Sequence, residues 1–146
     1  MKPRILFIED EPEFFAQFTK AIRARYELVQ VEDLTEAVNI LGQSDFSLVI
    51  VDIMLDIGIS KFPNVDDRRA GLYLIRLIRS RGSERRIALK CRSDVPLLAI
   101  TAVSDLSLEK KLLELDVPIV AKPFSLTAVC QKIDDMLKGF SGADDE

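Results

Sequence analysis

The chain has 146 residues, of which 48% are hydrophobic and 30% are charged, and its formal net charge is −4 at pH 7. This length favours a single domain with a sizeable core. No apolar run approaches the roughly 20 residues of a membrane helix, and the amino-terminal run is too short for a signal peptide, so we expect a cytoplasmic protein without membrane insertion. The chain has no His, which excludes a Ser-His-Asp triad and any His-ligated metal.

Five apolar runs recur along the chain and are separated by amphipathic stretches. We expect these runs to be β-strands, at 4–8, 26–31, 47–51, 96–100 and 117–121. Three of them show no polar alternation, which is typical of central parallel strands covered on both faces.

The stretches between the runs carry helical signals. Pro12 suits a first helical turn, and further helices are expected near 34–41, 71–81, 106–115 and 126–138. The candidate caps that begin helices are Asp33, Ser104 or Asp105, and Ser125. We expect the last helix to end at Gly139 and residues 140–146 to form a disordered acidic tail. The alternation of strands and helices predicts an α/β fold, a doubly wound sheet with helices on both faces.

The residues that follow four of the expected strands are polar and of distinctive kinds. They are Glu9 and Asp10 after the first strand, Asp52 after the third, Thr101 after the fourth and Lys122 after the fifth. The carboxyl ends of parallel strands meet at one edge of the sheet, where doubly wound folds bind their ligands. Adjacent carboxylates repel one another, so this cluster calls either for a cation as its counter-ion or for open water.

These groups together suit a divalent cation and a phosphoryl group. Mg²⁺ prefers oxygen ligands, typically one or two carboxylates with waters and phosphate oxygens. Thr101 can donate a hydrogen bond to one phosphoryl oxygen, and Lys122 can place its charge on another. Asp52 can act as the nucleophile, because carboxylates form acyl phosphates in phosphoryl-transfer proteins. If the donor is a phosphohistidine, it must belong to another molecule.

Four motifs at these strand ends resemble those of a known family. They are the acidic pair in "FIEDEP", Asp52 in "LVIVDIML", Thr101–Ala102 in "AITA" and Lys122–Pro123 in "AKPF". In this order they resemble the receiver domain of bacterial two-component response regulators, the CheY-like superfamily, and Gly71 fits the glycine that opens the third helix of that family. The resemblance covers residues 3 to about 138. It implies a receiver domain at 1–139 with a flavodoxin-like, five-stranded parallel sheet of strand order 2-1-3-4-5.

The resemblance implies a phosphoacceptor and a metal site. Asp52 would accept a phosphoryl group from a phosphohistidine of a sensor histidine kinase or a phosphotransfer protein. Mg²⁺ would be bound by Asp10, Asp52 and the backbone carbonyl of Met54, with Glu9 helping through water. The chain would not be an enzyme beyond catalysing its own phosphorylation and dephosphorylation. It would switch contacts with a downstream protein or pair as a homodimer, and would not bind nucleic acid by this domain alone.

Phosphoryl binding and switching are implied for Thr101, the backbone of Ala102 and Lys122. A cis peptide bond is implied before Pro123. The fifth strand of the family usually offers an aromatic residue three positions before the lysine, where this chain has Ile119. We therefore do not expect the aromatic version of the switch, while a shift of the threonine toward the phosphoryl group stays open.

Two segments that flank the expected third helix, near 56–70 and 82–95, are longer than is usual in the family. Residues 68–92 hold nine of the 20 Lys and Arg residues of the chain and one of its 24 acidic residues. This segregation of charge suggests either a docking surface for an acidic partner or nucleic acid beside the phosphorylation site, or a set of solvated arginines.

Other readings of the acidic cluster stay open. One is a receiver-like interaction module that is never phosphorylated. A metal-dependent nuclease of the topoisomerase type would need Asp-x-Asp after a strand, whereas Asp52-Ile53-Met54 lacks the second aspartate. A phosphohydrolase of the haloacid dehalogenase type would need Asp-x-Asp at the first strand, where "EDEP" does not supply it.

Overall fold

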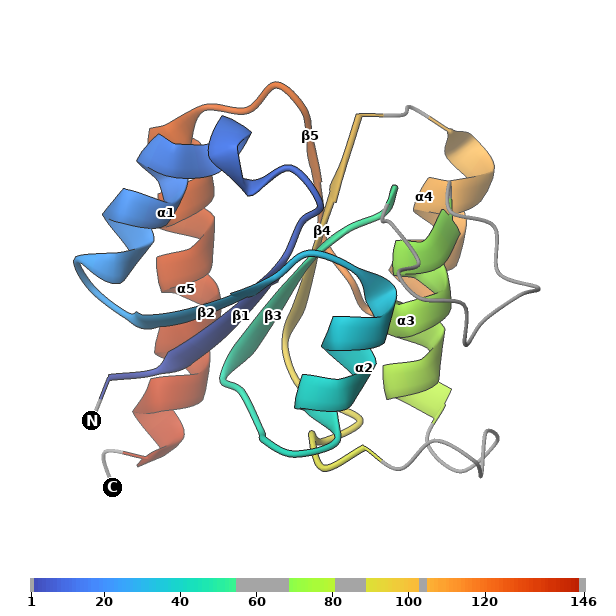
Figure 1. The fold of residues 1–146 in the computed structure, drawn as a ribbon, viewed down its shortest axis with the longest axis horizontal. Coiled ribbons are helices and arrows are strands. Elements are labelled where there is room, and N and C mark those ends of the chain that lie inside the picture. Colours follow the sequence, from blue (N-terminus) through green and yellow to red (C-terminus); the bar gives the residue numbers. More distant parts are fainter. Residues whose placement is uncertain (1, 55–68, 81–88, 103–104, 145–146) are drawn as a thin grey trace.

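A computed structural model describes residues 2–54, 69–80, 89–102 and 105–144. Its elements are β1 (Arg4–Ile8), the 3-10 helix η1 (Pro12–Phe15), α1 (Ala16–Arg23), β2 (Glu27–Val31), α2 (Leu34–Leu41), β3 (Leu48–Asp52), α3 (Ala70–Ser80), β4 (Leu97–Thr101), α4 (Leu106–Glu114), β5 (Ile119–Ala121) and α5 (Leu126–Asp144). Strands and helices alternate along the chain, as the sequence predicts (Figure 1). Among the described residues, no helix is both long and apolar enough to cross a membrane.

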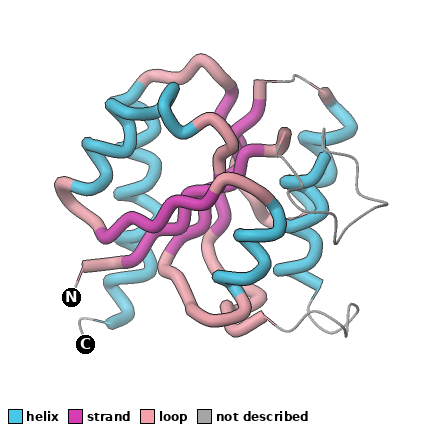
Figure 2. The backbone as a smooth tube through the Cα atoms, viewed as in Figure 1, coloured by secondary structure: helices cyan, strands magenta, loops and turns pink. Residues whose placement is uncertain are grey.

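The five strands form one parallel sheet in the order β2-β1-β3-β4-β5. Helices α1 and α5 cover one face of it, and α2, α3 and α4 cover the other (Figures 1 and 2). This arrangement confirms the predicted doubly wound fold and its strand order.

The two faces of the sheet explain why the strand sequences are apolar without interruption. Successive side chains of a strand point to opposite faces. In β1, Ile5 and Phe7 belong to the core under α1 and α5, whereas Leu6 and Ile8 belong to the core under the other three helices. All four side chains are fully buried. Since helices cover both faces, neither set of positions can be polar.

The helix starts follow the cap residues predicted from the sequence. The Asp33 side chain accepts a hydrogen bond from the Glu36 backbone N–H, and Asp105 accepts one from Ser107 N–H. The Ser125 hydroxyl accepts one from Ala128 N–H at the start of α5. These bonds satisfy backbone donors that the first helical turn leaves without partners.

The end of α5 differs from the prediction. The sequence places it at Gly139, but the helix continues to Asp144 and takes in most of the segment expected to be a tail. A glycine inside a helix costs only about 1 kcal/mol relative to alanine. Gly139 alone therefore does not stop the helix.

The described end of the second insertion, residues 89–95, lies at the amino ends of the strands. The Lys90 backbone N–H donates to the carbonyl of Leu41 at the end of α2, at 2.8 Å. Arg79 donates to the carbonyls of Ser93, at 2.8 Å, and Val95, at 2.7 Å. Residues 89–95 are therefore at the edge opposite the predicted phosphorylation site, and the prediction that this part of the insertion lies beside that site is wrong. Residues 55–68 and 81–88 lie outside the described part of the chain.

Candidate phosphorylation and metal site

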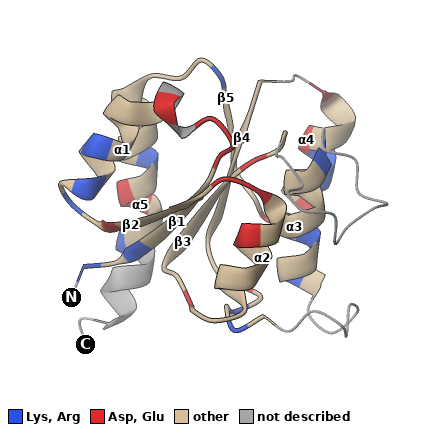
Figure 3. Ribbon diagram, viewed as in Figure 1, with Lys and Arg blue, Asp and Glu red and all other residues tan. Residues whose placement is uncertain are grey.

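The predicted polar residues meet at the carboxyl edge of the sheet. Acidic residues follow β1 and end β3, which are neighbouring strands (Figure 3). One carboxylate oxygen from each of Glu9, Asp10 and Asp52 can be chosen so that all three lie within 4.8 Å of one another. The topology causes this convergence, because the crossover between β1 and β3 brings both strand ends to the same edge.

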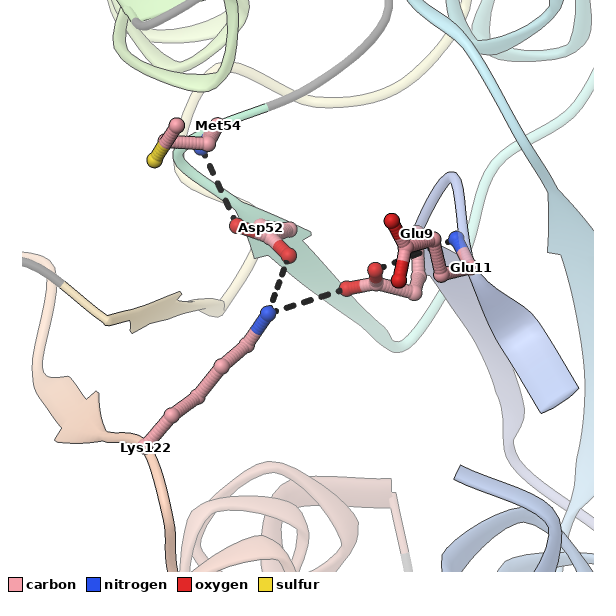
Figure 4. A network of polar contacts seen from close by, with 5 residues as sticks. All are labelled: Glu9, Glu11, Asp52, Met54 and Lys122. Carbon is pink, nitrogen blue, oxygen red and sulfur yellow. Dashed lines mark hydrogen bonds and ion pairs between the residues drawn. The ribbon is translucent and has the colours of Figure 1, made fainter. Parts of the chain in front are cut away.

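Lys122 reaches into this acidic cluster from the loop after β5. Its Nζ donates to Asp52 Oδ2 at 2.6 Å and lies 3.5 Å from Glu9 Oε2 (Figure 4). The other oxygen of Asp52, Oδ1, accepts the backbone N–H of Met54 at 3.0 Å. Both oxygens of Asp52 are thus held by donors, one of which carries a full positive charge.

Burial gives Glu9 an unusual protonation equilibrium. Its side chain is only 3% exposed, and this burial is the largest cause that raises its pKa to about 9. The hydrogen bond and the negative charge of Asp52 raise the pKa further, while Lys122 lowers it by less. For Lys122 itself, burial lowers the pKa, but the hydrogen bond and charge of Asp52 outweigh burial and raise it.

One oxygen of Glu9 is unsatisfied among the described residues. Glu9 Oε1 accepts the Glu11 backbone N–H at 3.2 Å, but the buried Oε2 accepts no hydrogen bond. Lys122 Nζ lies at ion-pair distance from Oε2 without hydrogen-bond geometry. A buried oxygen without a donor, beside two more carboxylates, fits a hard cation such as Mg²⁺.

Gly71 holds the backbone of Asp52 from the side of α3. Its N–H donates to the carbonyl of Ile53 at 3.0 Å. A Cβ on residue 71 would lie 2.3 Å from the carbonyl oxygen of Asp52 and 2.6 Å from the Cα of Ile53. Only glycine permits this approach, which gives the physical reason for the Gly71 that the sequence analysis singled out.

The remaining predicted residues surround the same edge. Thr101 ends β4 with its side chain buried, and its carbonyl accepts the Lys122 backbone N–H at 2.8 Å. Ala102 follows it and is exposed. The Lys122–Pro123 bond is cis, as the resemblance implies. Ile119 pairs with Ala99 and packs against the core on the side of α2, α3 and α4.

Phe15, which the sequence analysis does not single out, contacts the site. Lys122 Nζ lies over the Phe15 ring, 5.1 Å from the centroid. Phe15 and Lys122 also line a groove of about 770 Å³ that includes Gln17, Phe124 and Leu126. No local signal in the sequence marks this contact, because Phe15 falls within the helix expected from Pro12 onward.

Several solved structures of receiver domains and response regulators resemble this chain. The receiver domain of a Luxo repressor protein from Vibrio parahaemolyticus has a TM-score of 0.74 at 18% identity, over 99% of this chain and 96% of that one. The receiver domain of a sensor histidine kinase from Pseudomonas aeruginosa, with a magnesium ion coordinated in its active site cleft, has a TM-score of 0.64 at 22% identity, over 94% and 98%. The chemotaxis response regulator CheY4 of Vibrio cholerae has a TM-score of 0.67 at 14% identity, over 93% and 99%.

Comparison of the sequence alone finds no relative. No protein-family model matches it, and no curated protein matches it. The likeness lies in the three-dimensional structure, where it covers nearly the whole chain and nearly the whole of each neighbour. This chain has the fold of the receiver domains of response regulators.

Proposed function

We propose that this chain is a phosphoacceptor domain of a two-component phosphorelay, and that Asp52 takes a phosphoryl group from a phosphohistidine on a partner protein. The observation that carries the proposal is the Lys122–Asp52 hydrogen bond inside a cluster of three carboxylates. An ammonium and a hydroxyl residue, Thr101, at the same edge can neutralise and bind phosphoryl oxygens. The receiver fold of the neighbours supports the same reading.

In the proposed reaction an Asp52 oxygen forms a bond to phosphorus while the bond between phosphorus and the donor's imidazole nitrogen breaks. The imidazole leaves with that electron pair and is protonated by water. Lys122 moves its hydrogen bond from Asp52 to a phosphoryl oxygen, and Thr101 donates to another. Gly71 and the Met54 N–H keep the Asp52 carboxylate oriented for the attack.

The acidic cluster would hold Mg²⁺ through Glu9, Asp10 and Asp52, together with the backbone carbonyl of Met54. When bound, the ion supplies positive charge to the phosphoryl oxygens and to the crowded carboxylates. The raised pKa of Glu9 and its unsatisfied oxygen support this assignment, since both indicate that the nearby positive charge is too small to balance the carboxylates.

The partner in the forward direction would be a sensor histidine kinase or a phosphotransfer protein, because this chain has no His of its own. The output would be a change of contacts with a downstream protein or with a second copy of the chain. We place the activity in the cytoplasm, and we expect catalysis only of the chain's own phosphorylation and dephosphorylation.

The test is the intact mass of the protein after incubation with acetyl phosphate and Mg²⁺. We expect one added phosphoryl group, which is lost in Asp52→Asn and in the presence of EDTA. Asp135→Asn is the matched control, since Asp135 is an exposed residue of α5. Labelling of Asp52→Asn to the same extent as wild type would overturn the assignment of Asp52. A wild type that takes no label would instead favour an interaction module that works without phosphorylation.

A further inference from the structure

Lys122 is held by an aromatic ring as well as by a carboxylate. Its Nζ lies 5.1 Å from the centroid of Phe15 and 2.6 Å from Asp52 Oδ2. A cation within about 6 Å of a ring centroid is attracted by the negative face of the ring. The lysine side chain is only 26% exposed, so water screens this attraction incompletely.

The Phe15 ring is itself fixed by three other rings. Its centroid lies 5.4 Å from that of Phe7 in β1, with planes 80° apart, and 6.4 Å from that of Phe18 in α1. It stacks on Phe124, in the loop before α5, at 5.9 Å and 27°. Edge-to-face and offset-stacked pairs are the geometries that aromatic rings prefer. The ring is thus a rigid support for a flexible lysine.

Local structure gives no reason for a phenylalanine at this position. Phe15 ends the 3-10 helix η1 and directly precedes the first turn of α1, and its side chain makes no capping hydrogen bond. Ser, Thr, Asp and Asn are preferred there because their side chains accept backbone N–H bonds. The reason for Phe15 must therefore be tertiary: either apolar packing in the cluster of rings, or the contact with Lys122.

From this geometry we propose that Phe15 is a positioning residue that keeps the Lys122 ammonium beside Asp52 when the carboxylate becomes an acyl phosphate. The inference rests on the proposed function of Asp52. Phosphorylation moves the hydrogen bond of Lys122 from the Asp52 carboxylate to a phosphoryl oxygen, and during this exchange the four-carbon side chain has rotational freedom that the ring contact limits. The ring contact does not depend on Asp52, so it persists through the reaction. It also adds no formal negative charge, whereas a carboxylate in its place would repel the phosphoryl group.

The experiment compares phosphorylation rates by acetyl phosphate in Mg²⁺ for variants of one position. Phe15→Leu keeps apolar volume but has no ring, and we expect a rate about three- to tenfold lower than wild type, the range of one cation–π contact. Phe15→Trp keeps the strongest cation-binding face and should retain the wild-type rate within about twofold. Replacing Phe15 by 3,5-difluorophenylalanine keeps the shape of the side chain and weakens the negative charge on the ring face. The phosphorylation rate of this variant should lie between those of wild type and Phe15→Leu.

Phe18→Leu is the matched control, because Phe18 belongs to the same cluster of rings and, among the described residues, makes no cation–π contact with Lys122. Its rate should stay near that of wild type. A second readout needs no phosphorylation: the Lys122 ε-proton NMR signals should be shifted upfield by the ring in wild type and Phe18→Leu, and should lose that shift in Phe15→Leu.

The outcomes separate the two proposals. If wild type takes no label, the proposed function fails and the inference fails with it. If wild type is labelled but Phe15→Leu reacts at the same rate, only the inference is overturned. Equal losses in the Leu and Trp variants would also overturn it, because they would show that packing alone requires phenylalanine. A graded loss from Trp through difluorophenylalanine to Leu supports it.

Discussion

At the scale of single residues, Glu9 is the carboxylate of the site whose charged form is most destabilised by burial and by its neighbours. Its buried carboxyl has a pKa raised to about 9, first by burial and then by Asp52. In the metal-free protein the side chain therefore keeps its proton near neutral pH. A cation that replaces the proton would relieve the same repulsion, which links the protonation of Glu9 to metal binding.

We predict that the metal-free protein loses stability as pH rises from about 4.5 to about 9 because of Glu9. The folded protein binds the Glu9 proton more tightly than the unfolded chain does. The resulting contribution of Glu9 to the free energy of unfolding is therefore fully present below the ordinary pKa of 4.5. It declines as pH rises and is lost above the folded-state pKa. In EDTA, the melting temperature of wild type should fall by several degrees more across this range than that of Glu9→Gln.

Glu11→Gln is the control for this experiment, because Glu11 is a neighbouring acid with an exposed side chain. Its melting temperature should follow the wild-type curve across the pH range. A Glu9→Gln variant whose curve runs parallel to wild type would show that Glu9 does not hold its proton in the folded state.

Met54 leads to a prediction about the lifetime of the phosphorylated state. Its backbone N–H bonds to Asp52, and its side chain is 42% exposed beside that residue. A thioether accepts hydrogen bonds only weakly, so it cannot orient a water for attack on phosphorus. We expect slow hydrolysis, and decay of the phosphoprotein in Mg²⁺ about tenfold faster in Met54→Asn, where a side-chain amide can hold water.

Leu113→Asn is the control for this change, since Leu113 is an exposed leucine of α4 with no place in the site. Intact mass measured over time gives the decay rates, and identical decay in wild type and Met54→Asn would refute the idea. Val103, two residues after Thr101, is a second apolar residue that we expect to slow hydrolysis, but it lies outside the described residues.

At the scale of elements, the contact between α3 and β3 determines where Asp52 lies. We predict that Gly71→Ala lowers the free energy of unfolding by about 1–3 kcal/mol, because its Cβ would overlap the Asp52 carbonyl at 2.3 Å and force the two elements apart. Since Asp52 would move with its backbone, the rate of phosphorylation should also fall. Chemical denaturation and the acetyl phosphate assay measure the two effects.

Gly42→Ala provides the comparison for Gly71. Gly42 follows α2 with φ −75° and ψ −17°, a helical conformation that alanine adopts without strain. Its stability should equal or slightly exceed that of wild type, and its phosphorylation rate should be unchanged. A Gly71→Ala protein that behaves like Gly42→Ala would show that α3 does not constrain the site.

At the scale of the whole molecule, the two edges of the sheet differ in charge and role. The carboxyl edge holds the cluster of three acids, and the amino edge holds the described end of the basic insertion. Arg79 of α3 donates to the backbone carbonyls of Ser93 and Val95 in that insertion, and Arg92 of the insertion pairs with Asp45 at 3.4 Å. Arg79 thus joins α3 to the segment before β4, at the edge opposite the three carboxylates, whereas the solvent-exposed Arg92–Asp45 pair adds little stability. Arg85 and Arg86, the centre of the basic run, lie outside the described residues.

We predict that Mg²⁺ stabilises the whole domain by mass action, because the three carboxylates meet only in the folded chain. At about a hundred times its dissociation constant, the ion should add about 2.7 kcal/mol to the free energy of unfolding, or about 5 to 10 °C to the melting temperature. Asp52→Asn should show a smaller rise. NaCl at matched ionic strength is the control for screening, and an equal rise with NaCl would exclude a specific site.

Much of the fold could be predicted from the order of residues alone. Uninterrupted apolar strands separated by capped helices favour a doubly wound sheet, since right-handed crossovers bury both faces of a parallel sheet. That arrangement brings the residues after β1, β3, β4 and β5 to one edge whatever the details of packing. The convergence of Glu9, Asp52 and Lys122 was therefore predictable from their places at strand ends.

The contacts within the site depended on distances that no local pattern encodes. The bond from Lys122 to Asp52 spans 70 positions of sequence, and the burial that raises the Glu9 pKa comes from the packing of several elements. The ring of Phe15 reads as core in the sequence, and only the meeting of β1, α1 and the loop before α5 places it against Lys122.

The sequence by itself determined the layers, the helix caps and the polar residues of one edge, because each follows from local periodicity or from chain connectivity. The strand order was implied by the resemblance of the chain's motifs to those of receiver domains. Only the tertiary structure decided that α5 passes Gly139, that residues 89–95 lie at the far edge, and which oxygen of Glu9 has no donor. Those features depend on the balance of packing, burial and charge between segments distant in the chain, and that balance exists only in the folded molecule.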